Sequence, residues 1–371
     1  MSAFTLSFSI SCTINVVDVS VLVPLSSTQL VAMDMVTSTM VTLVIWMMVL
    51  PFMAHGAEIT DVDQFVTEYL ERALVTKLGE RSNVGNRKPW EEDVRLPRHI
   101  IPLHYDIYLH PNLETDLFSG HVTIQIEVTQ PSQHLQLHTK DLNITRTELT
   151  TEDGQQVDIL QAFEFGKNEF WVIQPVATVQ SGKYFLLVNF TGSLANGLDG
   201  FYKSVYTNNK GREVAIATSQ FEPTSARKAF PCFDEPSFKP TFSVSLVRPS
   251  TGYIALSNMP VQKELPNTPA KGLTTVIFAK SVPMVTYLAC FIVCDFEFEE
   301  TFTRNHNIRF RVYATREQKH RVNYSLDVGA NITDYFESYF GIPYPLPKQD
   351  MIAIPDFAAG AMENWGLITY R

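Results

Sequence analysis

Strict alternation of polar and apolar residues is the feature that most constrains this fold. Every second side chain from His121 to Val128 is apolar, which is the pattern of a strand with one face on a core and one in water. Similar runs recur between residues 105 and 279, and turn-forming pairs such as Asp153-Gly154 separate them. Residues 90–297 are therefore predicted to form one antiparallel β-domain, a sandwich or saddle.

The rhythm breaks at an acidic cluster that ends at Glu300, which we interpret as a solvated edge and as a domain boundary. Beyond a further alternating run, residues 316–340 show helical spacing, and Gly341 follows where a helix C-cap belongs. Two apolar runs between residues 351 and 370 then predict strands. Residues 298–371 are thus expected to be the incomplete start of an α+β domain that cannot close a core by itself.

The first 56 residues contain two acidic side chains and no Lys or Arg. Residues 35–54 are uncharged and about 20 residues long, the length that crosses a bilayer as a helix. They fit equally well to a secretory signal that ends in the small-x-small sequence Ala54-His55-Gly56. Residues 1–56 are therefore predicted to be a signal peptide or a signal anchor, with an artefactual extension as an open alternative, and residues 57–89 a polar stalk. An anchor would make the protein a single-pass type II membrane protein.

Four N-glycosylation sequons begin at Asn143, Asn189, Asn323 and Asn331. Such short motifs also arise by chance, so about half of them are expected to be unused. Beside a hydrophobic leader they indicate the secretory pathway, either the endoplasmic reticulum or the cell surface.

The formal net charge of -10 and the lack of long Lys/Arg runs argue against nucleic acid as a partner. Peptides with a free ammonium group fit this charge better. Cys290 and Cys294 share one face of an apolar, strand-like run, so we expect them to be buried free thiols. Homo- or hetero-oligomerisation stays open.

The segment Gly360-Ala361-Met362-Glu363-Asn364 resembles the amine-binding strand of the zinc aminopeptidases of the gluzincin class. The resemblance implies that this segment binds substrate, with Glu363 holding the α-ammonium of a peptide. The small residues Gly360 and Ala361 would let an extended peptide approach the strand edge closely.

A second segment, Gln220–Pro236, is similar to a signature in the β-domain of the same family, especially its oxytocinase and endoplasmic reticulum branch. It implies that Glu222 is a second carboxylate at the substrate amine and that Gln220 borders the pocket for the first side chain. We expect Asp234-Glu235-Pro236 to be a structural turn and Arg227 to pair with a nearby acid.

The resemblance covers about residues 95–371 and implies a thermolysin-like catalytic domain with zinc as cofactor. No H-E-x-x-H motif occurs among the nine histidines, so neither zinc ligands nor catalytic residues are expected in this chain. The sequence predicts the N-terminal part of a zinc aminopeptidase that trims peptides in the secretory pathway and is inactive alone. One alternative is a non-catalytic short isoform that acts as a peptide-binding or interaction module. Another is a related epoxide hydrolase, which Ala361 and the leader disfavour.

Overall fold

The computed structural model describes residues 88–371. The predicted leader, residues 1–56, and all but the last two residues of the predicted stalk, 57–89, lie outside the described residues. Arg87–Arg371 form one compact unit. Among the described residues, no helix has the length and apolar character that a membrane span requires.

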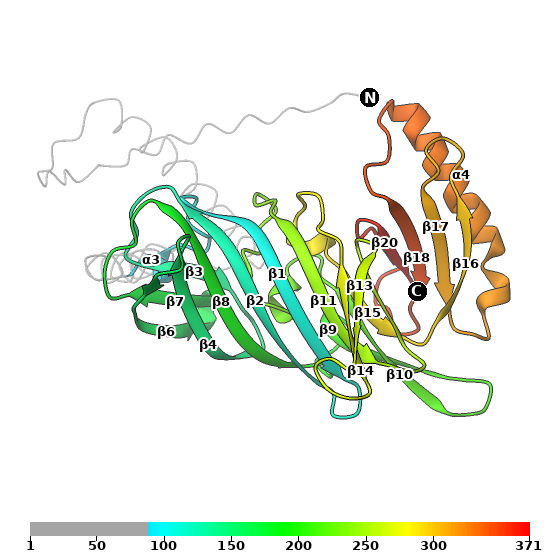
Figure 1. The fold of residues 1–371 in the computed structure, drawn as a ribbon, viewed down its shortest axis with the longest axis horizontal. Helices are drawn as coiled ribbons and strands as arrows, with labels where there is room; N and C mark the ends of the chain where they lie inside the picture. Colours follow the sequence, from blue (N-terminus) through cyan, green and yellow to red (C-terminus); the bar gives the residue numbers. More distant parts are fainter. Residues whose placement is uncertain (1–87) are drawn as a thin grey trace, which may run out of the picture. The chain divides into compact units, whose positions relative to one another are not determined.

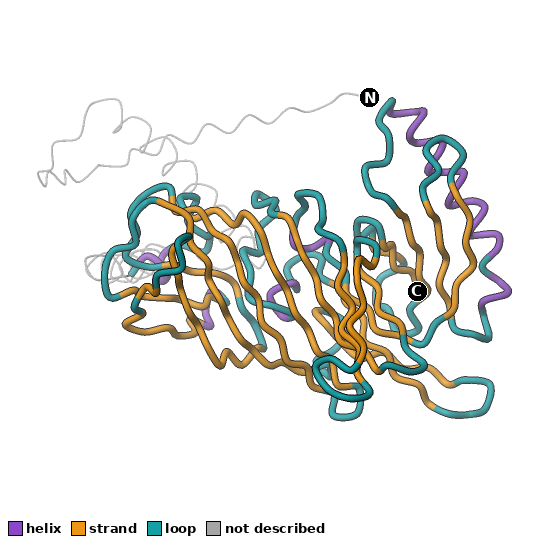
Figure 2. Tube along the Cα trace, viewed as in Figure 1, coloured by secondary structure: helices purple, strands orange, loops and turns teal. Residues whose placement is uncertain are grey.

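The central element of this unit is an eight-stranded sheet of order β13-β14-β11-β1-β2-β8-β4-β5 (Figures 1 and 2). All neighbouring strands in it are antiparallel except β1 and β11, which pair in parallel from His104–Thr241 to Leu109–Leu246. The strands are β1 (Ile100–Asn112), β2 (Leu117–Val128), β4 (Leu142–Thr151), β5 (Gln156–Val157), β8 (Gly182–Ser193), β11 (Thr241–Pro249), β13 (Val261–Pro266) and β14 (Leu273–Phe278).

Two smaller sheets cover one face of this sheet, with orders β3-β7-β6 and β12-β15-β10-β9. Their strands are β3 (Leu135–His138), β6 (Ile159–Phe165), β7 (Phe170–Pro175), β9 (Gly200–Thr207), β10 (Glu213–Gln220), β12 (Ile254–Ser257) and β15 (Phe291–Cys294). Inward side chains of the large sheet, such as Ile124 and Leu186, share one buried cluster with Leu137 and Phe291 of the smaller sheets. The predicted β-domain with alternating strands is confirmed.

Short helical turns occur before the first strand, between strands of these sheets, and just before the helix of the C-terminal part. They are α3 (Pro89–Glu92) and the 3₁₀ turns η2 (Gly166–Asn168), η3 (Ala226–Lys228), η4 (Thr286–Leu288) and η5 (Lys319–Arg321). Among the described residues the free cysteines are Cys232, Cys290 and Cys294, and all three are buried. The prediction of buried free thiols at Cys290 and Cys294 is thereby confirmed.

The C-terminal part forms a five-stranded sheet of order β16-β17-β18-β20-β19, with helix α4 along one face (Figure 1). The elements are β16 (Glu297–Phe302), β17 (Arg309–Ala314), α4 (Asn323–Phe340), β18 (Lys348–Ala353), β19 (Ala361–Met362) and β20 (Leu367–Tyr370). The helix ends at Gly341 as predicted, with a left-handed φ of 66°. It begins later than residue 316 because residues 319–321 make a 3₁₀ turn instead.

This sequence of elements confirms the expected opening of an α+β domain. However, the expectation that it lacks a partner to bury its strands is wrong for one face. Ile352, Met362 and Leu367 pack in one buried cluster with Ile216 and Ile292 of the four-stranded sheet. The acidic cluster lies on β16, the outer strand of the sheet, in accord with a solvated edge.

Candidate functional site

The segment Gly360–Asn364 includes an edge strand. Its strand β19 pairs with β20 through Ala361–Tyr370 and Met362–Thr369, and the Arg371 amide donates to the Gly360 carbonyl over 3.2 Å. Within residues 88–371 no further strand pairs with the other side of β19. The backbone of this segment is therefore open for pairing on that side.

Side chains of this segment alternate between solvent and interior. Gly360, Ala361 and Glu363 are exposed, whereas Met362 and Asn364 are each 1% exposed. The Asn364 side chain donates to the Thr369 hydroxyl over 3.1 Å. Met362 and Asn364 thus anchor the segment with their side chains, and the Asn364 carbonyl also accepts a hydrogen bond from the Leu367 amide over 3.0 Å.

One clasp precedes the exposed stretch. The Asp356 carboxylate accepts hydrogen bonds from the Val205 amide over 2.8 Å and the Ser204 hydroxyl over 3.0 Å, both on β9. The Tyr202 hydroxyl donates to the Asp356 carbonyl over 2.8 Å. These three bonds fix the start of the segment to the four-stranded sheet.

A second clasp follows the exposed stretch. The Asn258 side chain, just after β12, donates to the Trp365 carbonyl over 2.9 Å and to the Leu288 carbonyl over 2.7 Å. Gly366 has a φ of 84°, and a Cβ at this position would lie 2.5 Å from the Asn258 carbonyl oxygen. Only glycine fits this close approach of two backbones.

The second predicted group of residues lies at the end of β10. Gln220 closes that strand and is 8% exposed, and its side-chain oxygen has no hydrogen-bond partner in the described part of the chain. Glu222 lies two residues further on and is exposed. The turn that follows is closed by the Ser225 amide, which donates to the Phe221 carbonyl over 2.7 Å.

Strand register places Asn258, which holds the segment of Glu363, at the same end of the four-stranded sheet as the end of β10. In that sheet β15 separates β12 from β10. Phe291 of β15 pairs with Ser257 on one side and donates its amide to the Ser219 hydroxyl on the other, over 2.9 Å. Ser257 and Ser219 are therefore level. Glu222 continues beyond Ser219, while the clasp at Asn258 holds the segment of Glu363 beyond Ser257.

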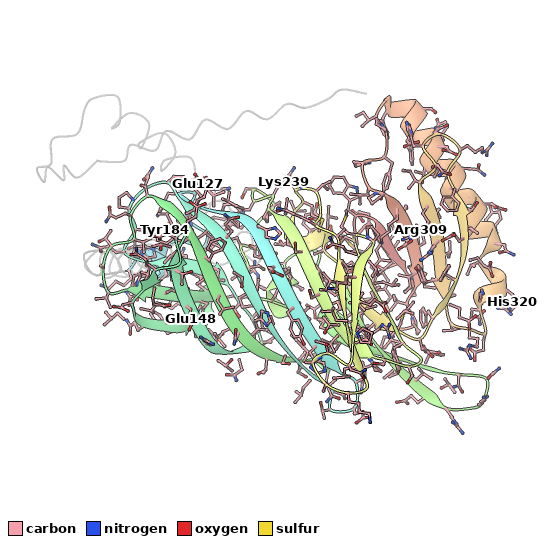
Figure 3. The ribbon with its side chains drawn as sticks, viewed as in Figure 1. Glu127, Glu148, Tyr184, Lys239, Arg309 and His320 are labelled. Atoms are coloured by element: carbon pink, nitrogen blue, oxygen red, sulfur yellow. The ribbon has the colours of Figure 1, made fainter. Side chains whose placement is uncertain are left out.

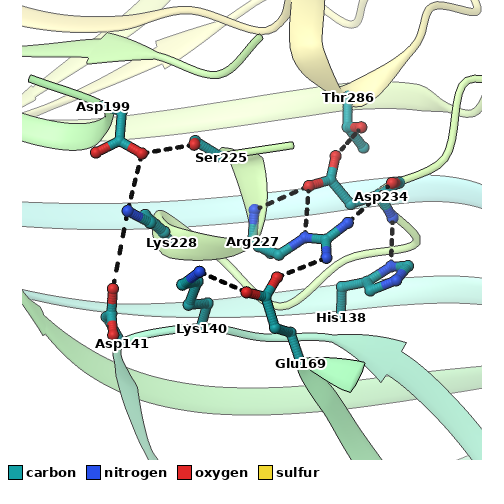
Figure 4. A network of polar contacts seen from close by, with 10 residues as sticks. All are labelled: His138, Lys140, Asp141, Glu169, Asp199, Ser225, Arg227, Lys228, Asp234 and Thr286. Atoms are coloured by element: carbon teal, nitrogen blue, oxygen red, sulfur yellow. Dashed lines mark hydrogen bonds and ion pairs between the residues drawn. The ribbon is translucent and has the colours of Figure 1, made fainter. Parts of the chain in front are cut away.

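A buried polar network supports the turn after Glu222 (Figure 4). The Arg227 guanidinium donates to Asp234 over 3.0 Å and to Glu169 over 2.8 Å. The Thr286 hydroxyl donates to Asp234 over 2.6 Å, and the Asp234 amide donates to the His138 ring over 3.2 Å. The prediction that Arg227 pairs with a nearby acid is confirmed.

Glu235 and His138 both lie next to Asp234 of this network, one along the chain and one through a hydrogen bond. Glu235 accepts a hydrogen bond from the Leu96 amide over 2.8 Å, so Asp234 and Glu235 both make hydrogen bonds within the fold, in accord with the predicted structural turn. Burial, with the charges of Arg227 and Arg95, lowers the pKa of His138 to about 3. The His138 ring is consequently neutral at physiological pH and free to accept the Asp234 amide proton.

Residues 88–371 contain no group of three or more His, Cys, Asp or Glu side chains that would hold a metal ion. The described residues thus offer no donor set for the zinc that the resemblance implies. Sequence reasoning missed the clasp residues Asn258 and Asp356, and also Lys348, a buried lysine whose ammonium donates to the Gly366 carbonyl over 2.7 Å and pairs with Asp350. Lys348 and Asp350 carried a readable signal, because two opposite charges two residues apart share one face of a strand.

Comparison with known proteins places these features in a family. Residues 101–288 match the Peptidase M1 N-terminal domain, and residues 324–371 match the Peptidase family M1 domain. The Gln220 to Pro236 segment falls in the first match and the Gly360 to Asn364 segment in the second.

Curated aminopeptidases agree with these matches. Glutamyl aminopeptidase of Bos taurus is 46% identical over 285 residues, covering 76% of this chain and 29% of that protein. Endoplasmic reticulum aminopeptidase 1 of Homo sapiens is 40% identical over 299 residues, covering 80% and 31%. Endoplasmic reticulum aminopeptidase 2 of Homo sapiens is 42% identical over 296 residues, covering 77% and 30%. The chain spans about 30% of the length of these relatives. It belongs to the peptidase M1 family, a family of hydrolases, and carries the family's N-terminal domain with part of its M1 domain.

Proposed function

We propose that this chain is the N-terminal part of an aminopeptidase and that it binds the N-terminus of the peptide substrate. The observation that carries this proposal is an exposed carboxylate, Glu363, beside an open strand edge. Its segment is clasped on both sides to the sheet whose strand β10 ends at Gln220, two residues before Glu222. Such an arrangement suits a ligand that carries both a positive charge and an extended backbone.

The ligand charge is the free α-ammonium of a peptide. A charge-assisted hydrogen bond from this group to Glu363 contributes roughly 1.5–3 kcal/mol, enough to select a free amine over a blocked one. A second carboxylate at Glu222 keeps the amine protonated as it leaves water. Gln220, with its unpartnered side-chain oxygen, borders the pocket for the first substrate side chain.

The ligand backbone pairs with β19. Because the Arg371 amide bonds to Gly360, the next pair in the antiparallel ladder, Ala361 with Tyr370, is not mutually hydrogen-bonded. The N–H and C=O of Ala361 therefore point to the open edge, where an extended peptide adds as a further strand. Carboxylates at the end of such a groove leave no room for upstream residues, which makes the enzyme an exopeptidase.

Peptidases of the M1 family are generally zinc enzymes. A bound zinc ion activates water and polarises the scissile carbonyl. The described residues do not fit the role of its ligands, and the printed sequence contains no H-E-x-x-H. We therefore assign no step of hydrolysis to this chain and infer that it does not cleave peptides alone.

We place the peptide-trimming role in the secretory pathway, in the endoplasmic reticulum or at the cell surface. Two of the relatives are named for the endoplasmic reticulum. Of the sequon residues, Asn143, Asn323 and Asn331 are exposed and Asn189 is half-buried, so three are accessible for glycosylation. The hydrophobic leader supplies a signal peptide or a type II anchor.

A second candidate is a non-catalytic peptide-binding module. It is favoured by the combination of an exposed candidate segment at Glu363 and the compact unit Arg87–Arg371. In that case the 371-residue chain binds a free dipeptide and releases no amino acid.

The test uses a full-length version of the protein with Glu363→Gln, and Glu213→Gln at the other, exposed end of β10 as control. The loss in kcat/KM should be roughly 2–4 kcal/mol, because a misplaced scissile bond impairs catalysis as well as binding. It should occur with every first residue, since all substrates share the α-amine. Glu222→Gln should act in the same direction more weakly.

N-acetylated substrates provide the reference for amine selection. Unchanged kcat/KM in Glu363→Gln would remove its assignment as amine anchor. A loss confined to one class of first side chain would move Glu363 to the specificity pocket instead.

A further inference from the structure

Lys348 is a buried lysine that joins three parts of the chain. It begins β18, is 2% exposed, and its ammonium donates to Ser257 O over 2.8 Å and Gly366 O over 2.7 Å. The third partner is the Asp350 carboxylate at 2.8 Å. An ammonium has three N–H groups, so each has one acceptor.

Packing alone does not require a charge at this position. Lysine is rarely buried fully, and a buried ion pair can usually be replaced by apolar side chains without loss of stability. Burial also lowers the pKa of Lys348, an effect that Asp350 opposes. Arg309, labelled in Figure 3, pairs with Lys348 in the parallel register of β17 and β18 and adds a like charge nearby. The contribution of Lys348 that an apolar side chain could not replace is therefore its link between two carbonyl groups.

Those carbonyls belong to the two sides of the candidate site. Ser257 ends β12, which is level with the end of β10 across β15. Gly366 lies three residues after Glu363. Asn258 reinforces the same junction, because its side chain bonds to Trp365, Leu288 and the Cys290 amide.

We propose that Lys348 and Asn258 are positioning residues that fix Glu363 relative to Glu222. This inference rests on the proposed amine-binding function. The path from one carboxylate to the other runs from Glu363 through the clasped Trp365 and Gly366 to the end of β12, then across β15 to β10. These contacts thereby set the distance between the exposed carboxylates of Glu363 and Glu222, which lie in separate segments of the chain.

Two variants of the full chain test this role. Asn258→Ala removes the bonds to Trp365, Leu288 and Cys290. Lys348→Met/Asp350→Leu removes both charges of the buried pair together, which avoids leaving an unpaired buried charge. The control is Ser281→Ala, which removes a buried bond to the Phe242 amide without touching the clasp.

Two measurements are made on each variant. Hydrogen exchange of residues 358–364 should rise about tenfold or more in both clasp variants, because loss of the clasp allows local opening. Binding of leucyl-leucine, followed by NMR with N-acetyl-leucyl-leucine as reference, should weaken about ten- to a hundredfold, since small misplacements have effects of this size. Ser281→Ala should change neither quantity by more than about twofold.

The outcomes separate this inference from the proposed function. If both clasp variants exchange and bind like Ser281→Ala, the positioning role is wrong. If the unaltered chain fails to bind leucyl-leucine, the amine-binding function is wrong, and the exchange of residues 358–364 alone decides whether the clasp exists. If Asn258→Ala does not fold, the exchange and binding of Lys348→Met/Asp350→Leu decide whether the positioning role is correct.

Discussion

The eight-stranded sheet and the five-stranded C-terminal sheet differ in how much of each face other elements cover. The large sheet packs one face on the smaller sheets and turns alternating polar residues of strands such as β2 to the other side. In the C-terminal sheet the pairs β17–β18 and β18–β20 are parallel, and parallel sheets are normally covered on both faces. Helix α4 supplies only part of the outer cover.

On the face of the C-terminal sheet that α4 covers, a cavity and several apolar side chains remain open to solvent. A cavity of about 560 Å³ lies between α4 and the sheet, lined by Phe310, Phe336 and Met351 among others. Large side chains remain exposed nearby, namely Tyr335 (60%), Tyr339 (68%), Phe340 (63%) and Ile342 (67%). The comparison teaches that antiparallel strands close a core with one face, whereas this parallel arrangement requires more chain than one helix.

The largest expected effect is a loss of stability in the β-domain, at the buried ion pair of Arg227 and Asp234. Arg227→Leu leaves the buried carboxylate of Asp234 without its guanidinium, so the free energy of unfolding should fall by about 3–5 kcal/mol. Lys140→Ala is the matched control, because this half-exposed lysine pairs with Glu169 in the same network and should contribute below about 1 kcal/mol. Urea unfolding followed by tryptophan fluorescence measures both. Equal losses would contradict the distinction between buried and exposed members of the network.

The next effect is a pH dependence in the same region. The pKa of His138 is about 3 in the folded protein and about 6.5 in the unfolded chain. As the pH falls below the unfolded value, only the unfolded chain takes up the proton. Stability should therefore be fully present above about pH 6.5 and fall by up to about 1.4 kcal/mol per pH unit towards pH 4. His138→Asn keeps an acceptor for the Asp234 amide and should remove this part of the slope; an unchanged slope would assign it to other groups.

A smaller effect probes the contact of α4 with the C-terminal sheet. A Cβ on Gly329 would lie 2.5 Å from the buried Phe310 ring and 3.0 Å from the Met351 sulfur. Overpacking of this kind costs about 1–3 kcal/mol, against a gain of about 1 kcal/mol in helix propensity. Gly329→Ala should therefore lower the protection of α4 amides from hydrogen exchange. Ser338→Ala on the exposed side of α4 serves as control, and equal protection in the two variants would contradict the tight contact.

The smallest effect on stability is expected on the uncovered face. Tyr339→Ser/Phe340→Ser changes side chains that are already exposed, so the free energy of unfolding should change by less than about 0.5 kcal/mol. Self-association should decrease, because the exposed apolar area shrinks. Sedimentation at several protein concentrations measures this. A stability loss similar to that of Gly329→Ala would mean that these rings already belong to a closed core.

Sequence patterns predicted those strands that have one buried and one solvent-exposed face. The run His121–Val128 lies within β2 because its alternation reports one buried and one exposed face. In contrast, β9 is almost entirely buried at its start and shows no such alternation, so the β9–β10 hairpin that carries Gln220 was not predicted. Boundaries of α4 were predicted well at Gly341 and poorly at its start, where η5 intervenes.

For the candidate site, resemblance supplied the segments and structure supplied the orientation. That Glu363 faces solvent while Met362 and Asn364 face inward follows from the pairing of β19 with β20. The clasp could not be predicted because its partners are distant in sequence: Lys348 and Ser257 are 91 residues apart. A single sequence contains no local pattern that reports such a contact.

The parallel pairing of β1 with β11 has a consequence for biosynthesis. Thr241 follows His104 by 137 residues, so at roughly 5–20 residues per second β1 waits about 7–27 s for this neighbour to be synthesised. Its other edge can pair with β2 almost at once. During the wait the nascent chain presents an unfinished sheet edge, which is a template for pairing with other chains. The centre of the largest sheet is thus completed late, and this edge of β1 is open during translation but covered by β11 in the finished protein.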